Sequence, residues 1–274
     1  HAPDVDSVVA SSLLTRVLLT QGIEVDIASL FEPLPEGDSI PIILIGLKVS
    51  KSIRNRKIYA ITYHRDASIY KHNDIVIITT GNTSLSILMA QALEELYIVP
   101  PECKLLALVA SLDRSSNSIF NKQLSELESK FVRKLISDGI IEITKTLKLF
   151  GYPLISVDEA LYVTIDPFIP GITGNEKGVK SLMKYLNISE KLSPTDIDKL
   201  AQELSNRIAK AVRKLSISKD QLIGDKVIIR KQNLIKDIYE TYYSISYGID
   251  KLGIKRVVPL ALSKLLLASL ITLY

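Results

Sequence analysis

The first hundred residues alternate short apolar runs with longer segments of helical periodicity, and this alternation restricts the fold more than any other feature of the chain. Apolar residues recur at helical spacing over residues 7–21, as on the buried face of a helix. Three later runs, at residues 40–47, 57–62 and 74–79, are rich in isoleucine and too short for helices, so they predict buried parallel strands. Strands that alternate with helices predict an open α/β sheet with right-handed crossovers.

The remainder of the chain reads as further helices and strands. A Ser-Pro-Thr-Asp sequence at residues 193–196 is a favourable helix start, and Gly151 is a natural helix end. The predicted elements are a half-buried strand at 23–27, a helix at 84–97, a helix or strand at 105–111, a long helix at 125–150, turns at 166–175, a helix at 177–186, a helix from 194 to about 215, a strand at 224–230 and a helix at 234–252.

The predicted fold class is therefore α/β: an open, mostly parallel sheet with flanking helices, then a helical segment and a smaller, incomplete α/β region at the C-terminus. The final run, residues 257–274, is almost wholly apolar. Pro259 and Lys264 interrupt it and no basic flank fixes an orientation, so a buried core helix is favoured over a membrane span. Because the chain starts and stops abruptly, we expect a fragment of a longer protein.

Composition narrows the class of protein. Apolar residues make up 47% of the chain and charged residues 23%, which excludes a wholly disordered chain. The one cysteine, Cys103, cannot form an internal disulfide or a cysteine-ligated zinc site and favours a reducing compartment. With no signal peptide at the start, we expect a cytoplasmic protein.

The net charge of +4 is unevenly distributed. Residues 1–100 carry 8 Lys and Arg against 11 Asp and Glu, whereas residues 201–236 carry 9 against 3. Such a basic stretch is typical of a solvated face, but it also allows nucleic-acid binding. The candidate nucleic-acid-binding residues are Arg207, Lys210, Arg213, Lys214, Arg230 and Lys231.

The most distinctive local pattern is at the start, where His1, Asp4 and Asp6 stand just ahead of the first predicted helix. In an open α/β sheet, this position is the carboxyl end of a strand, where ligands usually bind. Carboxylate oxygens and an imidazole suit Mn²⁺ or Mg²⁺. The alternative is that both aspartates only cap the helix and complement its dipole.

Residues 1–7 (HAPDVDS) resemble the first motif of the DHH phosphoesterase superfamily, which includes the RecJ single-strand exonucleases. Residues 166–189 (DPFIPGITGNEKGVKSLMKYLNIS) resemble a stretch of archaeal RecJ-like proteins, and residues 222–253 resemble, more weakly, the region that follows it. The resemblance implies a DHH-like domain with a helical insertion over residues 1–190 and a truncated, DHHA1-like region over residues 191–274.

The resemblance also implies a site for two metal ions held by aspartates from several strand ends, and the later motifs depart from that pattern. Gly46 stands where the second motif has an Asp, and Thr62 and Tyr63 stand where the Asp-His-His motif has Asp and the first His, so only His64 remains. Asp113 retains the acid of the fourth motif.

Loss of two carboxylates disfavours a pair of divalent ions, because each pair of unit charges about 4 Å apart interacts by roughly 4 kcal/mol at an effective dielectric constant of 20. The vestigial metal-site candidates are His1, Asp4, Asp6, His64 and Asp113. We expect no resident cofactor and no catalysis, the alternative being weak binding of one Mn²⁺ or Mg²⁺ ion.

A DHH-like chain with these departures resembles the archaeal RecJ-like relatives of the replication factor cell-division-cycle protein forty-five. The resemblance implies a structural component of the replicative helicase that binds the GINS complex and the MCM ring, with single-stranded DNA as a further partner and a nucleoid-associated location. The alternative is a metal-dependent 5′-to-3′ exonuclease of RecJ type with a rearranged site, and a third interpretation makes DNA the main ligand of the basic residues.

Overall fold

The computed structural model describes the chain except for residues 1, 29–39, 50–55, 115–123, 190–191, 212–216, 231–234, 236, 254–255 and 258–274. Contacts between residues group the chain into two compact units. The first unit comprises residues 1–140 and 231–274, and the second comprises residues 141–230. The domain boundary predicted between residues 190 and 191 lies within the second unit, so the contacts divide the chain at different positions.

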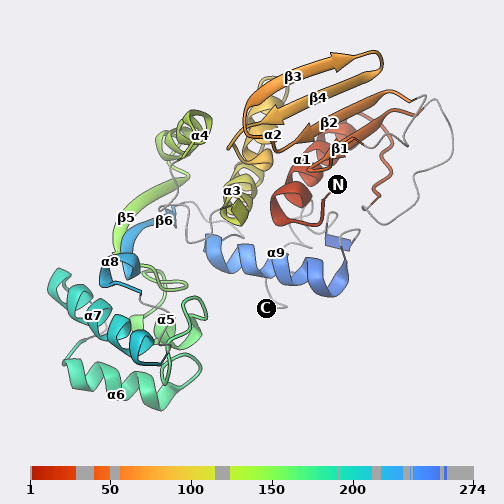
Figure 1. The fold of residues 1–274 in the computed structure, drawn as a ribbon. Helices are drawn as coiled ribbons and strands as arrows, with labels where there is room; N and C mark the ends of the chain where they lie inside the picture. The colour runs from red at the N-terminus through yellow and green to blue at the C-terminus, as the bar shows by residue number, and fades with distance from the viewer. Residues whose placement is uncertain are drawn as a thin grey trace. The chain divides into compact units, whose positions relative to one another are not determined.

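The first unit contains a four-stranded sheet in the order β1-β2-β4-β3 (Figure 1). Strands β1 (Ile42–Ile45), β2 (Ile58–Thr62) and β4 (Ile75–Thr80) are parallel, and they coincide with the three isoleucine-rich runs. The predicted open, mostly parallel α/β sheet is confirmed. The sequence reading missed β3 (Ala67–His72), a largely exposed edge strand that pairs antiparallel with β4 through a turn in which Asn73 has a φ of 49°.

The helices of the first unit lie near this sheet. Helices α1, α2 and α3 pack against one another on the same side of the sheet, and α9 returns from a distant part of the chain to pack against α1 and α3 (Figure 1). Among the described residues, the helices of this unit longer than one turn are α1 (Val5–Thr20), α2 (Leu85–Glu94), α3 (Pro101–Ala110), α4 (Glu126–Ser137) and α9 (Ile238–Leu252).

Two predictions of secondary structure are wrong. Residues 23–28 form no regular structure, although residues 23–27 alternate as a strand does. The long helix predicted at 125–150 is the helix α4 followed by the strand β5 (Ile141–Leu147), because the chain turns at Gly139, which has a φ of 63°. The undecided segment at 105–111 is helical, and Pro101 starts its helix.

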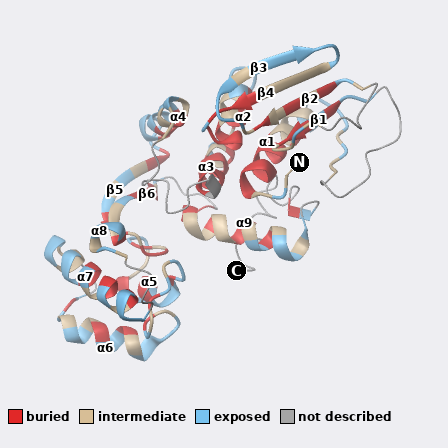
Figure 2. Cartoon of the chain, in the orientation of Figure 1, coloured by how far each residue is buried: buried red, intermediate tan, exposed pale blue. Residues whose placement is uncertain are grey.

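The second unit has an antiparallel pair of strands, β5 and β6 (Ile223–Ile229), with helices beside it. Helices α6 and α7 follow the predicted bounds closely, whereas the predicted strand at 224–230 begins one residue earlier, at Ile223. Figure 2 shows buried residues recurring between exposed ones along both helices, as expected for helices with one buried face. The helices of this unit among the described residues are α5 (Val157–Val163), α6 (Glu176–Leu186), α7 (Pro194–Ala211) and the single turn α8 (Lys219–Leu222).

Within the part of the chain that the structure describes, no helix has both the length and the apolar character needed to cross a membrane. The core helix predicted from the apolar run at 257–274 lies outside the described residues, apart from Val257, which is buried.

Candidate functional site

Asp4 caps the first helix. It is the N-cap residue of α1, and its Oδ1 and Oδ2 accept hydrogen bonds from the Ser7 amide and the Ser7 hydroxyl group, each 2.8 Å long. Both carboxylate oxygens therefore satisfy the start of the helix. This geometry agrees with the capping interpretation of Asp4.

Asp6 is fully buried and lies at the start of a different helix, α2. Its Oδ1 accepts hydrogen bonds from Ser84 Oγ (2.7 Å), from the Ser86 amide (2.9 Å) and from Ser86 Oγ. Its Oδ2 accepts from the Leu85 amide (2.8 Å) and from the Tyr63 hydroxyl group (2.6 Å). The carboxylate of Asp6 thus joins α1, the loop after β2 and the first turn of α2.

This arrangement stabilises a buried negative charge without a cation. The amide groups of Leu85 and Ser86 belong to the positive end of the α2 dipole, and hydrogen bonds to an ionised acceptor are stronger than neutral ones. A carboxylate offers about four lone-pair sites, and five donors already point at the oxygens of Asp6. A metal ion would have to displace several of these donors before it could bind Asp6.

A second buried carboxylate, that of Glu128 in α4, completes the start of α2. Its Oε1 accepts from the Ser84 amide (2.9 Å), and its Oε2 accepts from the Ser125 amide (2.9 Å) in a capping box. The three consecutive amides of residues 84–86 therefore donate hydrogen bonds to two buried carboxylates, those of Glu128 and Asp6. The sequence reading missed Glu128, although the spacing of Ser125 and Glu128 is the usual signal of a capping box.

Gly46 follows β1 and packs against the start of α1. Its φ is 72°, and a Cβ atom built on it would lie 2.1 Å from Ser7 Oγ and 3.0 Å from Ala2 Cβ. A side chain at this position requires both a strained backbone and displacement of the α1 cap. Thr62, the last residue of β2, is buried. The two positions that would supply acids thus hold a closely packed glycine and a buried hydroxyl group.

The other predicted metal-site residues do not join Asp6 in the described part of the chain. His64 is exposed, and its Nδ1 accepts a hydrogen bond from the Asp66 amide (3.3 Å). His1 lies outside the described residues, as does the side chain of Asp113, whose backbone belongs to the single 3₁₀ turn Ser111–Arg114. Among the described residues, no three His, Cys, Asp or Glu side chains are grouped to hold a metal ion. The residues around Asp6 do not fit a pair of metal ions.

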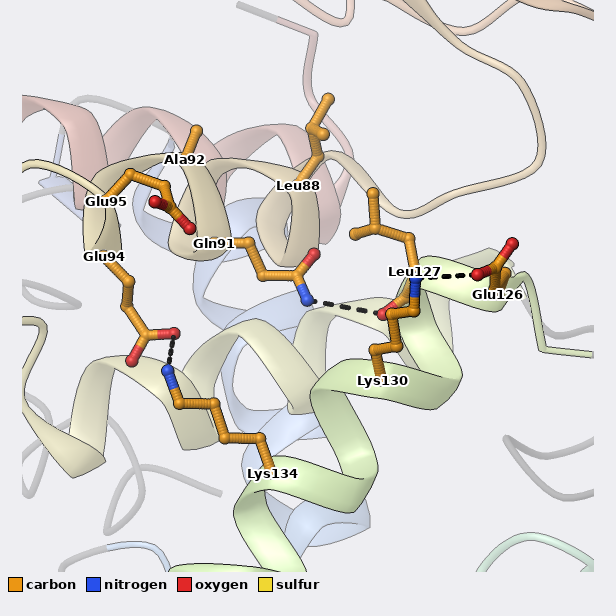
Figure 3. Close-up of a pocket in the computed structure, with 9 residues that line it drawn as sticks. All are labelled: Leu88, Gln91, Ala92, Glu94, Glu95, Glu126, Leu127, Lys130 and Lys134. Carbon is orange, nitrogen blue, oxygen red and sulfur yellow. Dashed lines mark hydrogen bonds and ion pairs between the residues drawn. The ribbon is translucent and has the colours of Figure 1, made fainter.

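A cavity of about 600 Å³ in the first unit lies between α2 and α4 (Figure 3). Its ionisable groups are largely paired: Lys134 Nζ is 2.9 Å from Glu94 Oε2, and Lys130 Nζ is 2.7 Å from Glu126 Oε1. Lys104 also contacts Glu94. The Lys134–Glu94 pair links α4 to α2, the Lys104–Glu94 pair links α3 to α2, and the Lys130–Glu126 pair lies within α4. Glu95 is a further exposed acid, and these residues form no recognisable catalytic constellation.

The described DNA-binding candidates belong to the second unit. Arg207 and Lys210 lie on α7, where Arg207 Nε bonds to Glu203 Oε1 at 2.8 Å. Arg230 follows β6 and bonds through Nε to Glu142 Oε2 at 2.6 Å. The Arg230–Glu142 pair is exposed and the Arg207–Glu203 pair is half-buried; ion pairs near the surface are weak and can be exchanged for phosphate contacts. The other three candidates, Arg213, Lys214 and Lys231, lie outside the described residues.

Comparison with known proteins identifies the wider class of this fold. The chain resembles the crystal structure of CDC45 from Entamoeba histolytica with a TM-score of 0.59 and 13% sequence identity, and the match covers 99% of this chain and 66% of that one. At this identity the match shows the fold alone, which is similar to that of CDC45. The chain spans less than two thirds of the length of that structure. Among curated proteins, no sequence matched the chain.

A family model described as archaeal Cdc45 matches residues 38–274. The chain therefore belongs to the archaeal Cdc45 family. Membership of this family supports the predicted involvement in DNA replication at that general level.

Proposed function

We propose that this chain is a non-catalytic replication factor, a structural component of the replicative helicase that binds the GINS complex and the MCM ring in the cytoplasm, at the nucleoid. The observation that carries the proposal is the hydrogen bond from Tyr63 to Asp6. In the motif reading, Tyr63 replaces a histidine of the Asp-His-His motif. Its hydroxyl group donates a hydrogen bond to Oδ2 of Asp6, an oxygen that a metal ion would need as a ligand.

Three further features support the loss of catalysis. Asp6 and Asp4 both serve as helix caps, Gly46 leaves no room for an acid, and Thr62 places a neutral group where the motif has an aspartate. Two adjacent divalent ions bring four positive charges, which require several carboxylates for compensation. Among the described residues, no three His, Cys, Asp or Glu side chains are grouped so that they could hold these ions.

A nuclease assay tests the absence of catalysis. Purified protein is incubated with 5′-labelled single-stranded DNA and Mn²⁺, and nucleotide release is measured against a Mn²⁺-free reaction. We expect no difference between the two reactions. Metal-dependent release that is abolished by Asp4→Ala would contradict the proposal and support the RecJ-type exonuclease.

The partner assignment needs its own experiment. The tagged chain is mixed with purified GINS and MCM from the same organism, and the complexes are separated by size-exclusion chromatography. Co-elution with either complex supports the scaffold role. Failure to bind either one, under conditions in which GINS and MCM are themselves intact, argues against it.

Contact with single-stranded DNA is the finer part of the proposal. If Arg207 and Lys210 contact phosphates, the logarithm of the binding constant falls by about 0.7 per contact for each tenfold rise in salt concentration. The variant with both residues changed to alanine is then expected to bind more weakly and with a shallower slope. A salt response that is flat in the unmodified chain removes DNA from the list of partners.

A further inference from the structure

The second unit displays a short run of large apolar side chains at the end of α5. Between residues 162 and 168, four such side chains are exposed, and Phe168 is 60% exposed. The other three are Tyr162, Val163 and Ile165. Exposed apolar side chains are common one at a time, whereas four within seven residues indicate a contact surface.

The segment that carries Phe168 is held firmly. The Thr173 hydroxyl group donates to the Thr164 carbonyl oxygen (2.8 Å) and accepts from the Ile169 amide (3.0 Å), and the Gly174 amide donates to the Tyr162 carbonyl oxygen (2.8 Å). Ile169, the neighbour of Phe168, is fully buried in the core of the unit. Phe168 is therefore presented from a fixed backbone, which lowers the entropy lost when a partner binds it.

The segment that carries this apolar run is acidic. Residues 149–176 contain four acids and no Lys, Arg or His. All four acids are exposed: Asp158, Glu159, Asp166 and Glu176. A cleft of about 220 Å³ between α5 and α6 is lined by three of them together with Tyr162, Val179 and Lys180. Lys180 pairs with Glu176, so the cleft keeps an excess of negative charge.

We propose that this surface, formed by residues 158–168 and the cleft beside them, docks an amphipathic helix of a partner protein. The helix has one apolar face flanked by Lys or Arg. Its apolar face covers Ile165 and Phe168, and one of its cations enters the acidic cleft beside Tyr162. A helix suits the site because it presents an apolar stripe and flanking charges at fixed spacing. Nucleic acid does not suit it, since phosphates would be repelled by the exposed carboxylates. The inference does not depend on the helicase role.

A peptide titration tests the proposal with the full chain. The probe is a fluorescein-labelled, 18-residue helical peptide of leucine and lysine with leucine on one face, and binding is followed by anisotropy. We expect saturable binding that Phe168→Ala weakens about tenfold or more, as for an interface hot spot. The control Tyr185→Ala removes an equally large aromatic side chain that is 74% exposed on α6, and we expect a change of less than about twofold.

The charge requirement is tested in the same assay. The double variant Asp158→Asn, Glu159→Gln should weaken binding of the leucine-lysine peptide, and a matched leucine-glutamate peptide should bind at least about tenfold more weakly to the unmodified chain. The proposal is overturned if the lysine peptide does not saturate, if Phe168→Ala binds as the unmodified chain does, or if Tyr185→Ala loses as much affinity. Phe168-dependent binding of a single-stranded oligonucleotide would overturn it too.

Discussion

At the scale of single residues, Asp6, which the sequence assigns to a vestigial metal site, serves as a hydrogen-bond acceptor at the start of a helix. Asp6 is buried among two serines, a tyrosine and two helical amides, and each of them donates a hydrogen bond to it. Removal of its charge leaves several buried donors unsatisfied, which is costly whether or not the protein has an activity. Substitution of Asp6 is therefore expected to lower the stability of the folded protein, whatever its effect on an activity.

The first prediction concerns Asp6 and Tyr63. Asp6→Asn should lower the free energy of unfolding by about 3 kcal/mol or more, because an amide group then faces five donors. Tyr63→Phe removes one bond to the charged group from a half-buried position and should cost about 1–2 kcal/mol. Urea denaturation measures both.

The matched control is Tyr59→Phe on β2, whose hydroxyl group has no hydrogen-bond partner within the described ranges. It should change stability by less than about 0.5 kcal/mol. If Asp6→Asn folded as stably as the unmodified chain, the structural role of Asp6 would be refuted.

Gly46 permits the second prediction. Gly46→Ala should destabilise the protein by at least about 2 kcal/mol, because it combines a positive φ with a Cβ that overlaps Ser7. Gly22→Ala is the control, since Gly22 has a similar φ of 74° and open space around its Cβ. Thermal denaturation of both variants separates the backbone cost from the steric one. Equal losses would show that the close approach to Ser7 is unimportant.

At the scale of elements, α2 is fixed at both ends by charge. At its start, the buried carboxylates of Asp6 and Glu128 accept hydrogen bonds from the first amides. In its last turn, Glu94 contacts Lys104 of α3 and Lys134 of α4. Burial by itself would raise the pKa of Glu94, but its hydrogen bonds with the two lysines lower that pKa below the ordinary value of 4.5. The ionised form of Glu94 is therefore favoured in the folded protein.

The third prediction follows from the sign of this shift. Because the folded-state pKa of Glu94 is the lower one, its stabilising contribution is present above pH 4.5 and is lost as the pH falls through the folded value. Glu94→Gln should cost about 1–2 kcal/mol at pH 7. The difference from the unmodified chain should shrink in acid. Glu95→Gln, an exposed neighbour, is the control, and a difference that is independent of pH would contradict the assignment.

Two segments of the chain adopt a structure other than the one that their local sequence predicts. Residues 141–144 alternate apolar and polar side chains, but because they come soon after a helix, the sequence favours a continuation of that helix. Residues 141–147 form a strand because the chain turns at Gly139 and because they pair with β6, more than seventy residues away. Residues 23–27 show the same alternation, but with no ladder partner in the described part of the chain they stay irregular.

At the scale of the whole molecule, the two units differ in how the chain builds them. The second is continuous in sequence and has a core of its own, drawn from β5, β6 and the helices α5–α7. The first is discontinuous, because α9 returns after residue 231 to pack against α1 and α3. Continuity favours independent folding of the second unit.

The fourth prediction tests this difference. Residues 141–230 expressed alone should give a helical circular dichroism spectrum and a cooperative thermal transition. Residues 1–140 alone should be less stable than the same unit in the full chain, because the faces of α1 and α3 that contact α9 are then exposed to water. An isolated second unit without a cooperative transition would show that its core is insufficient.

The sequence by itself determined the α/β class, the parallel strands and most helix positions, because these follow from local periodicity and from capping residues. It also singled out the DHH-like opening and the positions Gly46, Thr62 and Tyr63. Only the tertiary structure decided that Asp6 caps α2 and not its own helix, that the Tyr63 hydroxyl group donates to Asp6, and that Glu128 accepts from the Ser84 amide, 44 residues away in the sequence. Such contacts depend on how distant segments pack, and the periodicity of one segment carries no information about the side chains that will surround it.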